Sequence, residues 1–157
     1  MATALKLEGN ELVKSKEYAG ALAKYDSAIA LLVALAARSD EEEIVLTQCR
    51  CNRCMALAKL NIWDELHAEA SAVLAAKAAD HKGLYYRCLS NIERANAAAA
   101  SGAAAPFLKE ARVDIITASK QTPAPKGFTQ LRTKWGAATS AEKKRAASAH
   151  AKHFSFK

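Results

Sequence analysis

Lysine, carboxamide and other polar side chains recur at intervals of three or four residues along three segments of the sequence. Residues with this spacing share one face of a helix, so each segment would present a polar row. Ammonium groups neutralise negative charge, and carboxamides donate hydrogen bonds to carboxylate oxygens. Lysines at both ends with carboxamides between them suit a peptide whose carboxylates lie close together, such as a free C-terminus. The rows are Lys6, Asn10 and Lys14, then Gln48, Asn52, Met55 and Lys59, then Lys82 and Tyr86.

Residue patterns of catalysis are missing from the sequence, which has no Ser-His-Asp arrangement with supporting context, no glycine-rich phosphate loop and no paired helical histidines. The histidines stand alone, and a lone histidine is more often a surface residue than a catalyst. We therefore expect a binding protein, with no enzymatic activity and no cofactor.

Three of the four cysteines, Cys49, Cys51 and Cys54, fall on one predicted helix, and Cys88 on another. At i, i+2 and i+5 the three side chains point in different directions, so they cannot converge on a metal. The Cys51-x-x-Cys54 pair lacks both a second pair and the strand context of a redox motif. We expect reduced thiols that fill space, which is typical of a cytosolic or nuclear protein.

Residues 5–28 predict the helices that position the first row: two short amphipathic helices hinged at residues 15–17. Such a pair cannot bury its apolar stripe alone, which indicates a repeat. The stripe consists of Leu5, Gly9, Leu12, Tyr18, Ala21, Tyr25 and Ala28.

This order of small, large and aromatic residues is similar to the tetratricopeptide repeat (TPR), a helix-turn-helix unit. Gly9 takes the small position where the two helices cross, and Tyr18 opens the second helix. A second unit places residues 52–54 at the crossing, Trp63 at the start of its second helix and Leu66, Ala70 and Val73 on the packing face. A third begins near His81, with Pro106 in the first turn of its second helix and Ala111, Ile115 and Ala118 inward.

The resemblance implies an all-α fold, a right-handed superhelix of three TPR pairs (3–36, 40–76 and 81–119) with a C-terminal capping helix or tail. Tyr18, Tyr25 and Trp63 are expected in the core. Residues 31–45 add roughly three helical turns, and Ser39-x-x-Glu42 forms a capping box that restarts the next helix. A second capping box is expected at Thr139-x-x-Glu142, and a break near residues 101–106.

Lys-x-x-x-Asn in the first unit, Asn-Arg in the second and Lys in the third are similar to the dicarboxylate clamp of co-chaperone TPR domains. These include adaptor proteins, immunophilins and UCS-type myosin chaperones, which bind the Glu-Glu-Val-Asp C-termini of cytosolic heat-shock chaperones. The resemblance covers residues 3–119. It implies that Lys6, Asn10 and Asn52 hold the terminal carboxylate and that Lys82 pairs with the last Asp side chain or with backbone carbonyls. Lys14, Gln48, Met55 and Lys59 are either groove rim or simply exposed.

The fifth clamp residue of the family is an arginine four residues after the lysine, where this sequence has Tyr86. Arg87 follows it, about 100° around the helix, and should turn out of the groove. A tyrosine donates one neutral hydrogen bond in place of a charge-assisted fork, which weakens binding by about 1 to 3 kcal/mol. Either the clamp has relaxed specificity or the groove binds a related ligand.

Basic residues gather near the C-terminus: residues 120–157 hold nine Lys and Arg against one acid, Glu142, whereas residues 1–119 are nearly neutral. A linker, residues 121–126, precedes this tail, and Phe128, Leu131 and Trp135 could pack on the last repeat. The tail is either a solvated cap or an arm that binds an acidic partner. No leader and no membrane span are expected, which favours a cytoplasmic protein.

Two functions follow from these patterns. The first is a co-chaperone-like module that binds the acidic C-terminal peptide of a heat-shock chaperone. The alternative is a TPR scaffold that binds another assembly partner, with the basic tail contacting a polyanion.

Overall fold

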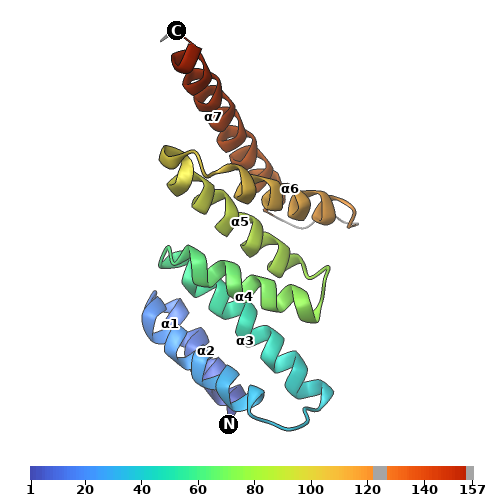
Figure 1. Ribbon diagram of the computed structural model, residues 1–157. Coiled ribbons are helices and arrows are strands. Elements are labelled where there is room, and N and C mark those ends of the chain that lie inside the picture. Colours follow the sequence, from blue (N-terminus) through green and yellow to red (C-terminus); the bar gives the residue numbers. More distant parts are fainter. Residues whose placement is uncertain (122–126, 155–157) are drawn as a thin grey trace. The chain divides into compact units, whose positions relative to one another are not determined.

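The computed structural model describes residues 1–121 and 127–154, and their side chains as far as residue 149. Within these ranges the chain is helical and contains no strand, which confirms the all-α prediction (Figure 1). The elements are α1 (Ala2–Lys14), α2 (Tyr18–Val33), α3 (Asp40–Lys59), α4 (Trp63–Ala76), α5 (His81–Ala98), a 3-10 turn (Ala99–Ser101), α6 (Ala105–Ser119) and α7 (Phe128–Phe154). The predicted linker at residues 121–126 lies, apart from Gln121, outside the described residues.

The helices form two compact units, Met1–Tyr86 and Arg87–Lys157. The first contains α1 to α4 and the start of α5, and the second contains the rest of α5 with α6 and α7. Among the described residues, no helix is both long and apolar enough to cross a membrane. No group of three or more His, Cys, Asp or Glu side chains there could hold a metal ion.

The α1–α2 pair forms because a glycine lets an aromatic ring approach the helix backbone. A Cβ atom on Gly9 would lie 2.6 Å from Cε1 of Tyr25, so only glycine fits beneath the ring. Tyr25, Ala21 and Ala28 are fully buried, as predicted. The hinge also lies at residues 15–17, where Lys16 adopts a left-handed backbone conformation with φ 65°. Tyr18 opens α2, as predicted, and is half-buried rather than fully buried.

The α3–α4 pair begins at the predicted capping box. The Ser39 hydroxyl accepts from the Glu42 backbone N–H, and the Glu42 carboxylate accepts from the Ser39 backbone N–H at 2.9 Å. Residues 31–45, which were expected to add about three helical turns, lengthen the end of α2 and the start of α3. Residues 34–39 between the two helices are not helical. The inner face of α4, at Leu66, Ala70 and Val73, is buried as predicted. Trp63 is half-buried and packs on a cluster of Cys54, Leu57, Leu66 and Ala70.

The α5–α6 pair confirms the third helical unit, with one correction on its inner face. α5 starts at His81, Gly102 ends the 3-10 turn at φ 76°, and Pro106 lies in the first turn of α6. Ala111 and Ala118 are fully buried, but Ile115 is only half-buried. The neighbouring Asp114 is fully buried instead, because its carboxylate accepts two hydrogen bonds from the Arg87 guanidinium, at 2.5 and 3.1 Å.

Helix α7 covers α6, as the predicted cap requires. Phe128 and Leu131 are buried, and the Trp135 indole N–H donates to the Leu108 carbonyl oxygen at 2.9 Å. The second predicted capping box is wrong, because α7 runs without a break from Phe128 to Phe154. Thr139 therefore lies inside the helix, where backbone N–H groups already bond to carbonyls of the preceding turn.

We expect Gly9→Ala to destabilise the protein. The added methyl group displaces the Tyr25 ring, and overpacking of this kind costs about 1 to 3 kcal/mol. Gly136→Ala is the matched control, since nothing lies within 4 Å of its Cβ position. There the higher helix propensity of alanine should stabilise by up to about 1 kcal/mol. Urea unfolding followed by circular dichroism measures both. Equal effects of the two variants would contradict the close approach of α1 and α2.

Candidate functional site

Four of the predicted site residues meet where α1 lies beside α3. The Lys6 ammonium donates to Gln48 Oε1 at 2.6 Å, and one turn further along α1 Asn52 Nδ2 donates to Asn10 Oδ1 at 2.9 Å. Lys6, Asn10 and Asn52 are half-buried, and Gln48 is exposed. The polar rows of the first two helix pairs therefore form one continuous surface.

Tyr25 fixes the orientation of the Asn10 side chain from below. Its hydroxyl donates to Asn10 Oδ1 at 2.8 Å, so this oxygen accepts from both Tyr25 and Asn52. Burial raises the pKa of Tyr25, with Cys49 adding to the rise and a hydrogen bond to Asn52 opposing it, and the hydroxyl keeps its proton at neutral pH. Because the oxygen of Asn10 is occupied twice, its amide hydrogens are the groups left to donate to a ligand.

Lys6 and Lys82 both act on the middle of α3. Burial raises the pKa of Cys49, and the nearby Lys6 ammonium opposes that rise. Burial, with help from Asp80, raises the pKa of Cys51 to about 11, and Lys82 opposes it. The two ammonium groups thus act electrostatically on the thiols of Cys49 and Cys51.

Asp80 anchors the helix turn that carries Lys82. Its carboxylate accepts from the backbone N–H groups of Lys82 and Gly83, at 2.9 and 3.0 Å. An acidic cap at this position satisfies N–H groups that have no partner within the helix. The positive end of the helix dipole also stabilises its negative charge. Gly83 lets the same turn pack on Val73 and Leu74, because a Cβ there would lie 3.0 Å from the Leu74 side chain. The Lys82 side chain itself is exposed.

The remaining predicted site residues differ in their surroundings. Lys14 is exposed and pairs with Glu11 of its own helix at 2.7 Å, Lys59 is exposed in the last turn of α3, and Met55 is half-buried. Tyr86 packs against the core cluster that contains Cys54 and Leu57, and burial raises its pKa. These four residues take no part in the Lys6–Gln48 and Asn10–Asn52 hydrogen bonds.

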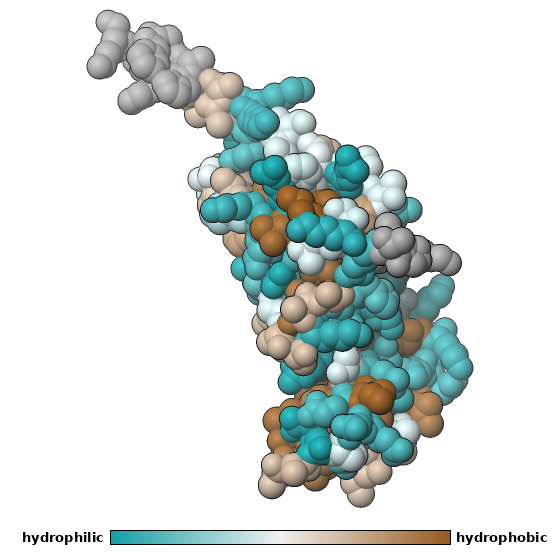
Figure 2. Space-filling view, turned by 90° about the vertical axis from the view of Figure 1, so that its right-hand side faces the viewer, coloured by the Kyte–Doolittle hydropathy of each residue, from teal (hydrophilic) through white to brown (hydrophobic). Residues whose placement is uncertain are grey.

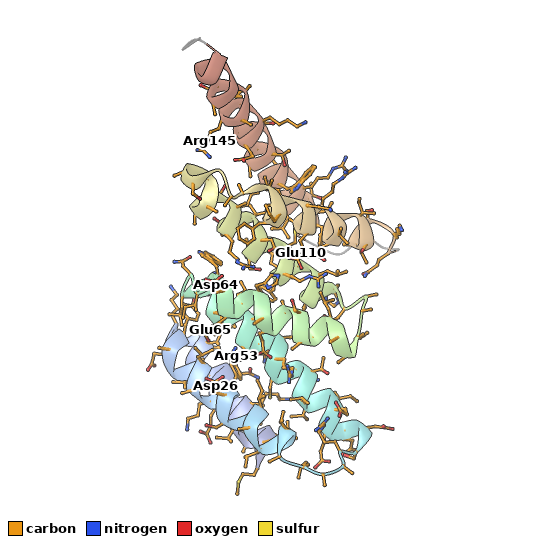
Figure 3. All side chains as sticks on the ribbon, in the orientation of Figure 1. Asp26, Arg53, Asp64, Glu65, Glu110 and Arg145 are labelled. Carbon is orange, nitrogen blue, oxygen red and sulfur yellow. The ribbon has the colours of Figure 1, made fainter. Side chains whose placement is uncertain are left out.

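Sequence reasoning missed an ion cluster centred on Arg53, directly after Asn52. Its guanidinium contacts Asp26 of α2 at 2.5 Å and Glu65 and Glu69 of α4 at 3.2 and 3.1 Å. Figure 3 shows Arg53 beside Asp26 and Glu65. Burial raises the pKa of Glu69, although Arg50 and Arg53 oppose the rise. The Asn-Arg pair in the sequence was the available signal, but its partners lie 12 to 27 residues away.

Comparisons with solved structures identify the fold. The chain is similar to the C-terminal TPR-containing domain of an FK506-binding protein of Plasmodium falciparum, with a TM-score of 0.74 and 21% identity over 93% of this chain and 91% of the other. It is also similar to the myosin chaperone UNC-45 of C. elegans, solved with an Hsp90 peptide, with a TM-score of 0.70 and 24% identity over 94% of this chain. This chain spans 15% of that UNC-45 chain. No family model and no curated protein matches the sequence. The fold is that of a TPR domain, as the sequence predicts.

We expect Arg53→Ala to lower the free energy of unfolding by about 2 to 4 kcal/mol, because the Glu69 carboxylate, whose side chain is only 12% exposed, keeps only Arg50, at 3.4 Å, as a partner. Glu65→Ala removes an exposed arm of the same cluster and should cost less than about 1 kcal/mol. Chemical denaturation of both variants measures the difference. A loss for Glu65→Ala as large as that for Arg53→Ala would show that burial of Glu69 is not the cause.

Proposed function

We propose that this chain is a protein-interaction module that binds the acidic C-terminal peptide of a heat-shock chaperone. The binding surface is a cradle defined by Lys6, Asn10, Asn52 and Lys82. No bond is made or broken in this function, so the module acts without catalysis or a cofactor. A cytoplasmic location follows from such a partner.

The observation that carries the proposal is the Asn10–Asn52 hydrogen bond held by Tyr25. It occupies the oxygen of Asn10 with two donors, Tyr25 and Asn52, so the amide hydrogens of Asn10 are the groups it has left for a ligand. A carboxylate has two oxygens that can accept about four hydrogen bonds, so one terminal carboxylate can satisfy both amides and an ammonium group. Donors fixed before binding lose little side-chain entropy on binding.

Binding requires one exchange within the cradle. The Lys6 ammonium now contacts the neutral oxygen of Gln48 at 2.6 Å. A ligand carboxylate would replace that neutral acceptor with a charged one, and such charge-assisted hydrogen bonds are roughly twice as strong. Gln48 is exposed, so water can satisfy its oxygen after the exchange.

We assign Lys82 to the second carboxylate of the ligand, while Tyr86 limits the affinity. The Tyr86 ring belongs to the core around Cys54 and Leu57, so its hydroxyl can offer only one neutral hydrogen bond. The side chain of the last ligand residue is therefore held less firmly than its terminal carboxylate. UNC-45 was solved with an Hsp90 peptide, which supports a heat-shock chaperone as the source of the ligand. The alternative, an internal segment of an assembly partner, lacks the free terminal carboxylate that the cradle suits.

A peptide ending in Glu-Glu-Val-Asp tests the proposal by isothermal titration calorimetry. We expect a Kd on the order of micromolar, and a loss of roughly 10- to 100-fold for Lys6→Ala or on amidation of the peptide, since each removes a charge-assisted hydrogen bond. Lys24→Ala is the matched control, because Lys24 lies on α2 and pairs with Glu8 at 2.7 Å. Its Kd should match that of the original protein. Binding unaffected by both Lys6→Ala and amidation would end the clamp proposal.

A second test addresses Tyr86. Tyr86→Phe keeps the ring in the core and removes the hydroxyl, so the peptide affinity should fall by about 0.5 to 1.5 kcal/mol if that hydroxyl contacts the ligand. A peptide with its last Asp side chain replaced by Ala should bind both proteins equally, because the ligand group has gone. Unchanged affinity of Tyr86→Phe for the original peptide would remove Tyr86 from the binding site. Thermal unfolding checks that the variant keeps the fold.

A further inference from the structure

A groove of about 430 Å³ lies between α6 and α7 within the second unit. Its volume falls in the range typical of ligand sites. None of its residues belongs to the cradle, which lies in the first unit. The groove is lined by Arg112, Ile115, Ile116, Ala118 and Ser119 of α6 and by Phe128, Thr129, Arg132 and Trp135 of α7.

Contacts between the two helices fix the walls of this groove before any ligand binds. The Trp135 indole N–H bonds to the Leu108 carbonyl oxygen at 2.9 Å, and Leu131 is almost completely buried. Ala111 and Ala118 of α6 are fully buried on its inner face. A preformed groove avoids part of the ordering cost of binding.

The groove combines an apolar floor with apolar surface that remains exposed to water. Phe128 is buried and Trp135 half-buried, whereas Ile116 keeps 43% of its surface exposed. Figure 2 shows apolar surface among hydrophilic side chains at the level of α6 and the start of α7. A bulky apolar side chain in the groove would remove this surface from water.

One arginine stands on each wall, Arg112 on α6 and Arg132 on α7. Both are exposed, and neither has an ion-pair partner among residues 87–121 and 127–149. The four acidic residues of the second unit all have basic partners elsewhere: Glu93 pairs with Lys134, Glu110 and Asp114 with Arg87, and Glu142 with Arg145. Residues 87–157 hold 13 Lys and Arg against these four acids. The groove therefore lacks negative charge of its own.

We propose that the α6–α7 groove binds an acidic segment of a partner protein, in which a bulky apolar side chain lies between carboxylates. The apolar side chain occupies the floor near Phe128 and Trp135, and the carboxylates pair with Arg112 and Arg132, whose planar guanidinium groups suit bidentate contacts. Because α6 and α7 enclose the groove from two sides, a peptide side chain can enter it, whereas a flat lipid surface would contact only its rim. No free C-terminus is needed, so this site is independent of the cradle.

The test uses the full chain and a labelled probe peptide, Glu-Glu-Asp-Phe-Leu-Glu-Glu, acetylated at one end and amidated at the other so that the cradle has no terminal carboxylate to bind. Fluorescence anisotropy at about 0.15 M salt limits long-range attraction. We expect saturable binding that weakens at least about tenfold in the double variant Arg112→Glu, Arg132→Glu, because each wall then repels the peptide. Lys143→Glu, Lys144→Glu makes the same change in charge on exposed α7 residues outside the groove and should change the Kd less than about twofold.

Three further measurements decide the assignment. A peptide with Ser in place of Phe and Leu must bind at least about tenfold more weakly, since equal binding would mean that charge alone is recognised. Ile116→Asp should abolish binding of the original peptide with unchanged circular dichroism, and full affinity in that variant would overturn the groove. Lys6→Ala must leave the probe peptide's Kd unchanged. Failure to bind the probe would overturn the acidic peptide as occupant, and binding to anionic vesicles or self-association that is lost in Arg112→Glu, Arg132→Glu at equal salt would replace it by a lipid surface or a second copy.

Discussion

The structure of the first unit depends on how closely Tyr25 approaches α1. Its ring lies only 2.6 Å from where a Cβ atom of Gly9 would be, and its hydroxyl donates a hydrogen bond to Asn10, the residue after Gly9 on α1. One side chain therefore sets both the distance between α1 and α2 and the orientation of a carboxamide on the surface. Because the ring is fully buried, it has no freedom to release Asn10 without disturbing the core.

Arg53 plays the corresponding part for α3. Its guanidinium joins α2, α3 and α4 through carboxylates, and a planar group with five donors can serve three partners at once. Asn52 is adjacent to Arg53, so the ion cluster and the Asn10 contact restrain neighbouring residues of one helix turn. The polar surface of the first unit is thus positioned by interactions beneath and beside it, which is how a binding site keeps its donors in place before a ligand arrives.

The features that the sequence predicted are local ones. The hinge before Tyr18 and the Ser39 box each act within one or two helix turns, Gly9 meets Tyr25 of the helix directly after it, and the apolar period identifies the buried faces. The capping box predicted at Thr139 was wrong because the sequence pattern of a capping box does not reveal whether the preceding residues are already helical. Asp114 could not be expected in a core, since its burial depends on Arg87, 27 residues earlier. Arg53 and its carboxylates escaped prediction for the same reason: pairing over such distances follows from the packed helices.

Packing of the core also accounts for the residue type at position 86, near the start of α5. The position where a clamp would carry a second charge is occupied by Tyr86, whose ring completes the cluster around Cys54 and Leu57. A guanidinium in its place would have to leave that apolar contact for solvent, because an unpaired buried charge is costly. Packing has therefore been favoured over charge at this one position. In the proposed cradle, recognition would then rest on Lys6, Asn10 and Asn52, the residues that we assign to a terminal carboxylate, more than on the groups assigned to the side chain beside it.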